Sequence, residues 1–154
     1  GEYLLKSLKR NDSDSCIIFP KFVDRAVGFI VRYQTETDAA WLTTILFSNF
    51  QAASPEVLML AALDQEGTIV AHLIAKTEMY AGQTVGYVMQ VDKDEGIQGL
   101  DIMETGWENV KEWCAENKLK RLFNWGLNEK VMRIWRSQYG FTVHRYLMVR
   151  EMEE

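Results

Sequence analysis

Cysteine is scarce in this sequence, and its placement argues against a disulfide framework or a zinc site. Cys16 and Cys114 are the only cysteines in 154 residues, and neither lies in a CxxC or Cys/His arrangement of metal ligands. Cys114 falls on the apolar stripe of an expected helix, where a buried and inert thiol is the usual interpretation. We therefore expect no metal, a reducing compartment and a cytoplasmic location.

Positive charge is also in short supply. Lys and Arg total 17 against 22 Asp and Glu, which leaves a formal net charge of -5. Non-specific nucleic-acid binding needs an excess of cations to displace counterions, so this balance argues against a nucleic-acid partner. No apolar run is long enough to cross a bilayer, and no basic segment followed by an apolar one opens the chain. We expect no membrane partner.

What remains is an ordinary globular composition, with 47% hydrophobic and 25% charged residues. A chain of 154 residues suits a single domain with a sizeable core. Residues 1–26 are mixed and turn-rich, and they are interpreted as an N-terminal extension packed on the domain. Residues 27–154 are expected to form that domain.

The periodicity of apolar residues predicts alternating strands and helices after residue 26. β-Branched and aromatic residues predict a first strand at 27–34, and Thr35 with Asp38 resembles a capping box that starts a helix to about Ala52. Further strands are expected at 56–64, 68–79, 84–91, 119–126 and 141–150, with helices from about 100 to 117 and after Asn128.

The expected order is therefore β-α-β-β-β-α-β-α-β. Consecutive strands joined by tight turns must pair antiparallel, whereas the strand-helix-strand step between residues 84 and 126 must be a parallel crossover. The predicted fold class is α/β, with a mixed sheet and helices on both faces.

This order and three stretches of sequence resemble the GNAT superfamily of N-acetyltransferases. "FIVRYQTETDAAWL" is similar to the family's opening strand and helix, with Arg32 and Asp38. "YVMQVDKDEGIQGLD", residues 87–101, stands where the family binds the acyl-CoA pyrophosphate. "NEKVMRIWRSQYGF" is similar to its asparagine, helix and closing Gly-Phe, here Asn128, Gly140 and Phe141.

The resemblance implies acetyl-CoA as cosubstrate. The family's pyrophosphate loop reads (Arg/Gln)-x-x-Gly-x-(Gly/Ala). When its first position is placed five residues after Val91, Gly96, Gly99 and Asp101 stand at the three defined positions. Only Gly99 matches, and the stretch contains four carboxylates, Asp92, Asp94, Glu95 and Asp101. Backbone N–H groups at a helix N-terminus favour an anion. The implied cofactor-binding residues are Met89, Gln90, Val91, Gly96, Ile97, Gln98, Gly99, Leu100, Asp101 and Asn128.

The catalytic residues that the resemblance implies are less well matched. The family often uses a tyrosine in the last helix as the acid that protonates the CoA thiolate. Counting forward from Asn128 places Trp135 at that position, and counting back from Gly140 and Phe141 places Arg136 there. Tyr139 lies about one turn further on. Glu78 is a candidate base for the acceptor amine. His72 shares a strand face with Val70 and Ile74, so a core histidine is the commoner interpretation.

Two functions stay open. The first is an acyl-CoA-dependent N-acyltransferase, transferring acetyl from acetyl-CoA to a small amine or to a protein N-terminal or lysine amine by direct attack in a ternary complex. The alternative is a catalytically degenerate GNAT-like domain that serves as a binding or assembly module. The acidic loop and the missing tyrosine favour the alternative, whereas the glycines and the Asn-helix-Gly-Phe ending favour the enzyme. A homodimer is open in either case.

Overall fold

The computed structural model describes residues 3–97, 100–125 and 129–152, with Leu100 and Asp101 described by their backbone alone. The chain divides into two compact units, Gly1–Asn124 and Trp125–Glu154. No described helix is long and apolar enough to cross a membrane.

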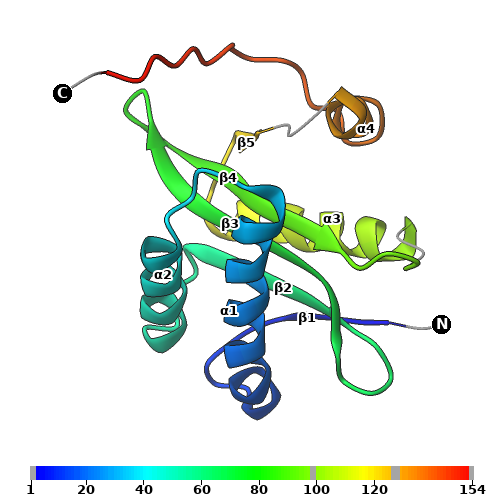
Figure 1. Ribbon diagram of the computed structural model, residues 1–154. Helices are drawn as coiled ribbons and strands as arrows, with labels where there is room; N and C mark the ends of the chain where they lie inside the picture. The colour runs from blue at the N-terminus through cyan, green and yellow to red at the C-terminus, as the bar shows by residue number, and fades with distance from the viewer. Residues whose placement is uncertain (1–2, 98–99, 126–128, 153–154) are drawn as a thin grey trace. The chain divides into compact units, whose positions relative to one another are not determined.

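The first unit is built on one five-stranded mixed sheet (Figure 1). Its strands stand side by side in chain order, and every neighbouring pair is antiparallel except β4 and β5, which are parallel. The strands are β1 (Leu4–Ser7), β2 (Val57–Leu63), β3 (Ile69–Tyr80), β4 (Gln83–Lys93) and β5 (Leu122–Asn124).

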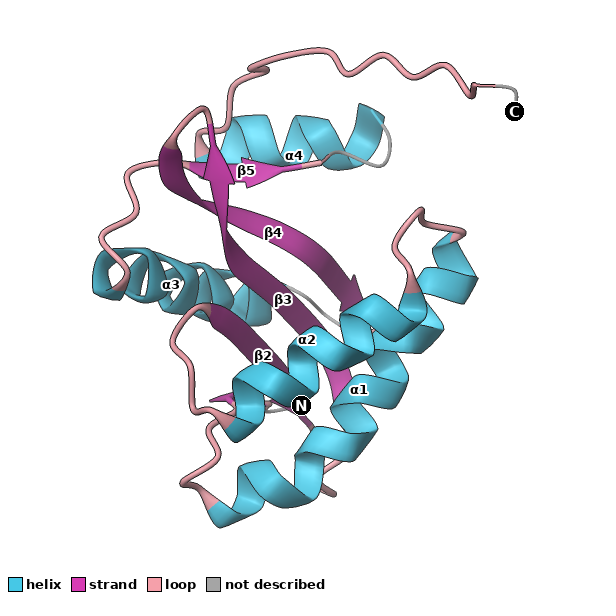
Figure 2. Cartoon of the chain, turned by 90° about the vertical axis from the view of Figure 1, so that its left-hand side faces the viewer, coloured by secondary structure: helices cyan, strands magenta, loops and turns pink. Residues whose placement is uncertain are grey.

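Helices cover both faces of this sheet (Figure 2). On one face, α1 (Ser13–Tyr33) and α2 (Ala39–Gln51) bury an apolar cluster that includes Phe22 and Leu46 against β2 and β3. On the other face, α3 (Leu100–Glu116) packs Val110 and Trp113 against the strands. The mixed α/β fold class predicted from the sequence is confirmed.

The strand predicted at 27–34 is wrong, because residues 27–33 belong to α1 and Gln34 is its C-cap. Asp12 caps this helix by accepting a hydrogen bond from the Ser15 N–H at 3.1 Å. Buried residues then recur along one stripe, at Phe19, Phe22, Val23, Ala26 and Phe29. Burial of that stripe outweighs the strand propensity of the neighbouring β-branched residues Val27, Ile30 and Val31.

The segment 1–26 also supplies elements of the sheet layer. Leu4 of β1 pairs with Leu63 of β2, and the predicted boundary between residues 26 and 27 falls inside α1. The observed order is β1-α1-α2-β2-β3-β4-α3-β5-α4. The capping prediction at Thr35 is also corrected, since Asp38 itself is the N-cap of α2 and accepts from the Trp41 N–H at 2.8 Å.

The second unit contains α4 (Glu129–Tyr139) followed by a segment without regular structure. The closing strand predicted at 141–150 is not present there. Its alternating side chains are largely exposed, with Tyr146 at 89% and Met148 at 91%. An alternating pattern describes a strand only where the backbone is paired with a neighbour, and residues 141–150 belong to no sheet ladder.

Close packing of β4 on α3 gives a test of the first unit. A Cβ added at Gly86 would lie 2.9 Å from Leu122 Cδ1 and 3.2 Å from Trp113, whereas one added at Gly28 on α1 would meet nothing within 4 Å. Gly86→Ala should therefore lower the free energy of unfolding by about 1–3 kcal/mol through overpacking. Gly28→Ala should raise it by about 0.5–1 kcal/mol, since alanine restricts the unfolded chain. Urea unfolding measures both, and equal effects would contradict this packing.

Candidate functional site

The most distinctive backbone feature of the first unit is the end of the ladder between β4 and β5. The parallel ladder joins Gly86, Tyr87 and Val88 to residues 122–124 and, in the part of the chain that the structure describes, extends no further along β4. The register between β3 and β4 shifts at the same place, because Ile74 pairs with Gln90 while Ala75 pairs with Val88. Met89 is thus the extra residue of a β-bulge, and β4 continues to Lys93 with an open edge.

The open edge presents the backbone of alternate residues. The Asp94 N–H donates to the Val70 carbonyl at 2.8 Å, so Asp94 and, two residues earlier, Asp92 face β3 with their peptide groups. The intervening residues, Val91 and Lys93, therefore direct their N–H and C=O groups toward the open edge. Of the predicted backbone contacts Met89, Gln90 and Val91, the pattern favours Val91. Gln90 is 4% exposed, and its side chain lies on the face of the sheet that α1 covers.

A glycine turn connects β4 to α3. The Ile97 N–H donates to the Asp94 carbonyl at 3.3 Å, and Gly96 has φ +82°, a conformation that glycine adopts without strain. The Lys93 ammonium donates to the Ile97 carbonyl at 3.2 Å. The helix that follows is 17 residues long, and the N–H groups of its first turn have no partner within the helix, which gives that end a partial positive charge.

This turn and helix start are the predicted anion-binding loop. Gly96 and Ile97 lie in the turn, and Leu100 and Asp101 lie in the first turn of α3. The predicted binding residues Gln98, Gly99 and Asn128 fall outside the described residues, as do the side chains of Leu100 and Asp101.

The carboxylates before the turn are bound to α1. The Asp92 side chain, 5% exposed, accepts from the Tyr33 hydroxyl at 2.9 Å, from Arg25 at 3.3 Å and from Arg32 at 3.4 Å. Asp94 pairs with Arg25 at 2.9 Å. These two carboxylates are therefore neutralised from within the fold.

His72 belongs to the same polar cluster and is poorly suited to act as a base. Arg25 donates from Nε to His72 Nδ1 at 2.9 Å, and arginine is only a donor, so Nδ1 must be unprotonated. The remaining Nε2–H then donates to Gln90 Oε1 at 2.8 Å, and Gln90 donates to the Ala26 carbonyl at 3.0 Å. Burial, reinforced by the charge of Arg25, lowers the pKa of His72 to about 4 despite the opposing bond to Gln90.

Glu78 lies six residues further along β3, away from the His72 cluster. Its carboxylate side chain is 51% exposed and lies 4.0 Å from the Lys76 ammonium. On β4, Tyr87 pairs with Lys76, and burial together with the negative charge of Glu78 raises the pKa of Tyr87 to about 12. An exposed carboxylate beside a neutral phenol is chemically able to accept a proton from an amine.

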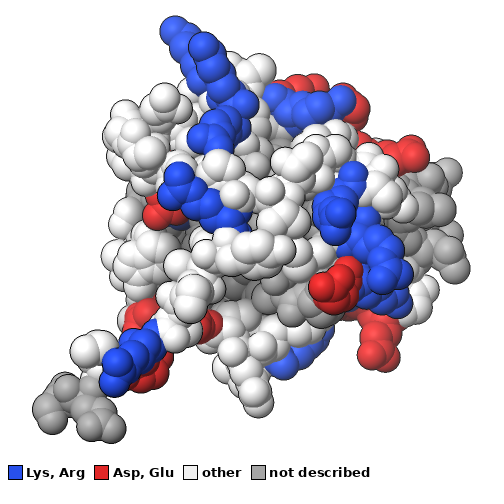
Figure 3. All heavy atoms as spheres, turned by 90° about the horizontal axis from the view of Figure 1, so that it is seen from above, with Lys and Arg blue, Asp and Glu red and all other residues white. Residues whose placement is uncertain are grey.

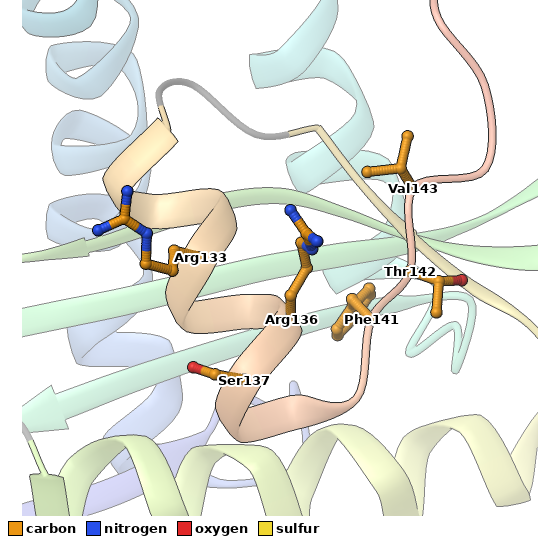
Figure 4. Close-up of a pocket in the computed structure, with 6 residues that line it drawn as sticks. All are labelled: Arg133, Arg136, Ser137, Phe141, Thr142 and Val143. Carbon is orange, nitrogen blue, oxygen red and sulfur yellow. The ribbon is translucent and has the colours of Figure 1, made fainter.

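The other two predicted catalytic residues lie together in the second unit. The rings of Trp135 and Tyr139 have centroids 5.2 Å apart, and Phe141 packs edge-on against Trp135 at 5.2 Å. An open pocket beside them is lined by Arg133, Arg136, Ser137, Phe141, Thr142 and Val143 (Figure 4). Its guanidinium and hydroxyl groups suit an anionic ligand.

The charged surface is mixed in sign. On the face drawn in Figure 3, Lys and Arg side chains stand beside Asp and Glu side chains. Among the described residues, no group of three or more His, Cys, Asp or Glu side chains is arranged to hold a metal ion.

Sequence reasoning missed Arg25 and misjudged Asp92 and Asp94. The sequence did contain a signal. Gln90, Asp92 and Asp94 occupy alternate positions, so their side chains lie on one face of the sheet, the face that α1 covers. Three polar residues on a covered face require partners. Arg25 could not be assigned as that partner while residues 1–26 were interpreted as an extension.

Comparison with solved structures defines the fold class of the chain. A predicted acetyltransferase from Clostridium acetobutylicum, solved with acetyl-CoA, superposes with a TM-score of 0.75 at 10% identity, covering 97% of this chain and 96% of that one. An aminoglycoside acetyltransferase from an uncultured soil metagenomic sample gives 0.67 at 16% identity, covering 99% and 97%.

A GCN5-related N-acetyltransferase from Ralstonia eutropha gives a TM-score of 0.64 at 9% identity, covering 97% of this chain and 99% of that one. No protein-family model and no curated protein matches the sequence. The chain therefore has the GNAT acetyltransferase fold, as the resemblance implied.

The neutral state of His72 gives a pH-dependent test. The folded pKa of about 4 lies below the ordinary value of 6.5, so between these pH values only the unfolded chain takes up a proton at this residue. The free energy of unfolding should fall as pH decreases through this window, with His72 contributing on the order of 3 kcal/mol. His72→Gln should remove that part of the slope in urea titrations, and His144→Gln serves as the exposed control. An unchanged slope in His72→Gln would contradict a buried neutral imidazole.

Proposed function

We propose that this chain is an acyl-CoA-dependent N-acyltransferase that transfers acetyl from acetyl-CoA to an amine by direct attack in a ternary complex. The observation that carries the proposal is the open edge of β4 beyond Val88, followed directly by the Gly96 turn and the start of α3. An extended thioester arm fits beside an unpaired strand edge by hydrogen bonding to its backbone. A diphosphate fits at the helix start that follows. The neighbour solved with acetyl-CoA supports this arrangement.

The chemistry needs positioning, polarisation and two proton transfers. A backbone N–H on the β4 edge, for which Val91 is the best candidate, polarises the thioester carbonyl. The amine nitrogen forms the new C–N bond, the C–S bond breaks, and the CoA thiolate leaves. Glu78 is the proposed base for the amine proton and acts through intervening water, because its partner Val85 lies six residues before Val91 on β4. Tyr139 is a better acid for the thiolate than Trp135, because an indole N–H does not titrate in the range of a phenol.

The acidic loop had favoured a degenerate, non-catalytic module as the alternative. Asp92 and Asp94 are paired with α1, so they do not present two free negative charges to a diphosphate. That removes part of the argument for the alternative. Glu95 lies exposed in the turn itself.

The acceptor is proposed to be a small amine or a polypeptide amine. Two of the structural neighbours are forms of an aminoglycoside acetyltransferase, one of them with sisomicin. Polyamine sugars of that kind are therefore reasonable first compounds in an acceptor screen. The surface beside Glu78 and Tyr87 is the proposed amine side of the site.

The glycine turn provides the direct test of acetyl-CoA binding. Gly96 and Gly67 have nearly the same φ angle, +82° and +81°, and a Cβ added at either residue would meet nothing within 4 Å. Gly96→Val and Gly67→Val should each cost about 1–3 kcal/mol of stability through backbone strain. Acetyl-CoA should raise the melting temperature of the wild type and of Gly67→Val, and much less that of Gly96→Val. No response of the wild type at millimolar ligand would favour the alternative.

The proposed base is tested separately. Glu78→Gln keeps the shape of the side chain and removes its proton-accepting charge, so kcat should fall by about 100-fold or more at neutral pH. KM for acetyl-CoA should stay unchanged, because Glu78 lies apart from the proposed diphosphate site. Glu66→Gln, in the exposed turn between β2 and β3, is the control. Full activity of Glu78→Gln with the identified acceptor would exclude this role.

A further inference from the structure

Arg25 of α1 makes an unusually complete set of hydrogen bonds. Nε donates to His72 Nδ1 at 2.9 Å. One terminal nitrogen contacts the Ile69 carbonyl at 3.2 Å and Asp94 at 2.9 Å. The other contacts the Val70 carbonyl at 3.4 Å and Asp92 at 3.3 Å. The guanidinium therefore makes four hydrogen bonds and a further ion pair, and all three of its nitrogens take part.

These acceptors lie on two paired strands rather than on α1. Ile69, Val70 and His72 belong to the start of β3, whereas Asp92 is the last residue but one of β4 and Asp94 opens the turn that follows. The Asp94 N–H also donates to the Val70 carbonyl. Arg25 thus joins one helix to the point where β4 passes into the Gly96 turn.

The pairing is required by burial as well as by geometry. The side chain of Arg25 is 16% exposed and that of Asp92 is 5% exposed. A charge so far removed from water is costly unless it is paired and hydrogen-bonded, and removing one partner leaves the other unsatisfied. Lysine cannot substitute, because an ammonium on a flexible stem lacks the planar arrangement that reaches several acceptors at once.

We propose that Arg25 is a positioning residue for the acyl-CoA diphosphate. Through Asp92 and Asp94 it fixes the start of the turn, so that the Gly96 backbone and the first turn of α3 are held ready for the anion. Its positive charge also offsets two carboxylates that would otherwise repel that anion. The anchoring of the turn is independent of any ligand, whereas the diphosphate rests on the proposed function.

The experiment compares Arg25→Lys with Arg32→Lys. Both change arginine to lysine on α1 next to Asp92, but Arg32 is 59% exposed and makes one long contact to that carboxylate. Without ligand, hydrogen exchange of the Asp94 and Ile97 amides should accelerate by about tenfold in Arg25→Lys and little in Arg32→Lys. Exchange in α2 should stay as in the wild type.

The second measurement is the affinity for acetyl-CoA at a temperature where each variant is folded. Arg25→Lys should bind acetyl-CoA about tenfold more weakly than the wild type. Gly67→Val should bind it normally, since that substitution lowers stability without touching Arg25 or the β4–β5 ladder. This control separates positioning from a general loss of stability.

Every result bears on the proposal. Wild-type exchange at Asp94 and Ile97 in Arg25→Lys would overturn the anchor, and an unchanged affinity would overturn its role in binding. If the wild type itself binds no acetyl-CoA, the proposed function fails while the exchange data still decide the anchor. Should Arg25→Lys not fold, Asp94→Asn removes only the half-exposed ion pair. It should accelerate exchange at Ile97 by about two- to threefold, and no acceleration would again overturn the anchor.

Discussion

The buried carboxylate of Asp92 is the constraint on which the site depends. It lies at the end of β4, where the strand leaves the sheet, and it is neutralised by side chains of α1. A buried charge must be compensated, so the end of α1, the end of β4 and the start of β3 have to come together in one arrangement. The core beneath them, with Phe22 and Ile74 fully buried, keeps that arrangement rigid.

The shape of the proposed site follows from two local irregularities along β4. The bulge at Met89 and the end of the β5 ladder at Val88 coincide, so the strand loses its second neighbour at the point where its register changes. β5 is three residues long, so its ladder with β4 ends at Val88. Beyond this extra residue, the side chains of Gln90 and Asp92 face α1. The backbone N–H and C=O groups of Val91 point to the edge of β4 away from β3.

Much of this fold could be predicted from the sequence, and the failures have physical causes. The hairpin strands and α3 have clear periodicities, and they were predicted close to their observed limits. Residues 27–34 were misassigned because β-branched residues favour strands locally, while the stripe from Phe19 to Phe29 shows a helix only over a longer window. The alternation in residues 141–150 predicted a strand that their backbone does not form.

The carboxylates before the turn were the hardest feature to interpret. Asp92 and Asp94 stand in the stretch where the resemblance places an anion site, and their negative charges taken alone argue against such a site. The structure pairs Asp92 with Arg25, which is 67 residues away in the chain, and such a partner leaves no mark in a short stretch of sequence. Gly96 has a positive φ, which a glycine adopts without strain in the turn before α3.

The most direct test of the account is an NMR titration of the ¹⁵N-labelled protein with acetyl-CoA. The account predicts that the backbone amides of Val91, Lys93, Gly96 and Ile97 shift together and saturate, while amides of β1 and α2 remain unchanged. Absence of shifts at millimolar acetyl-CoA, or shifts confined to other parts of the chain, would contradict the placement of the acyl-CoA site on the open edge of β4.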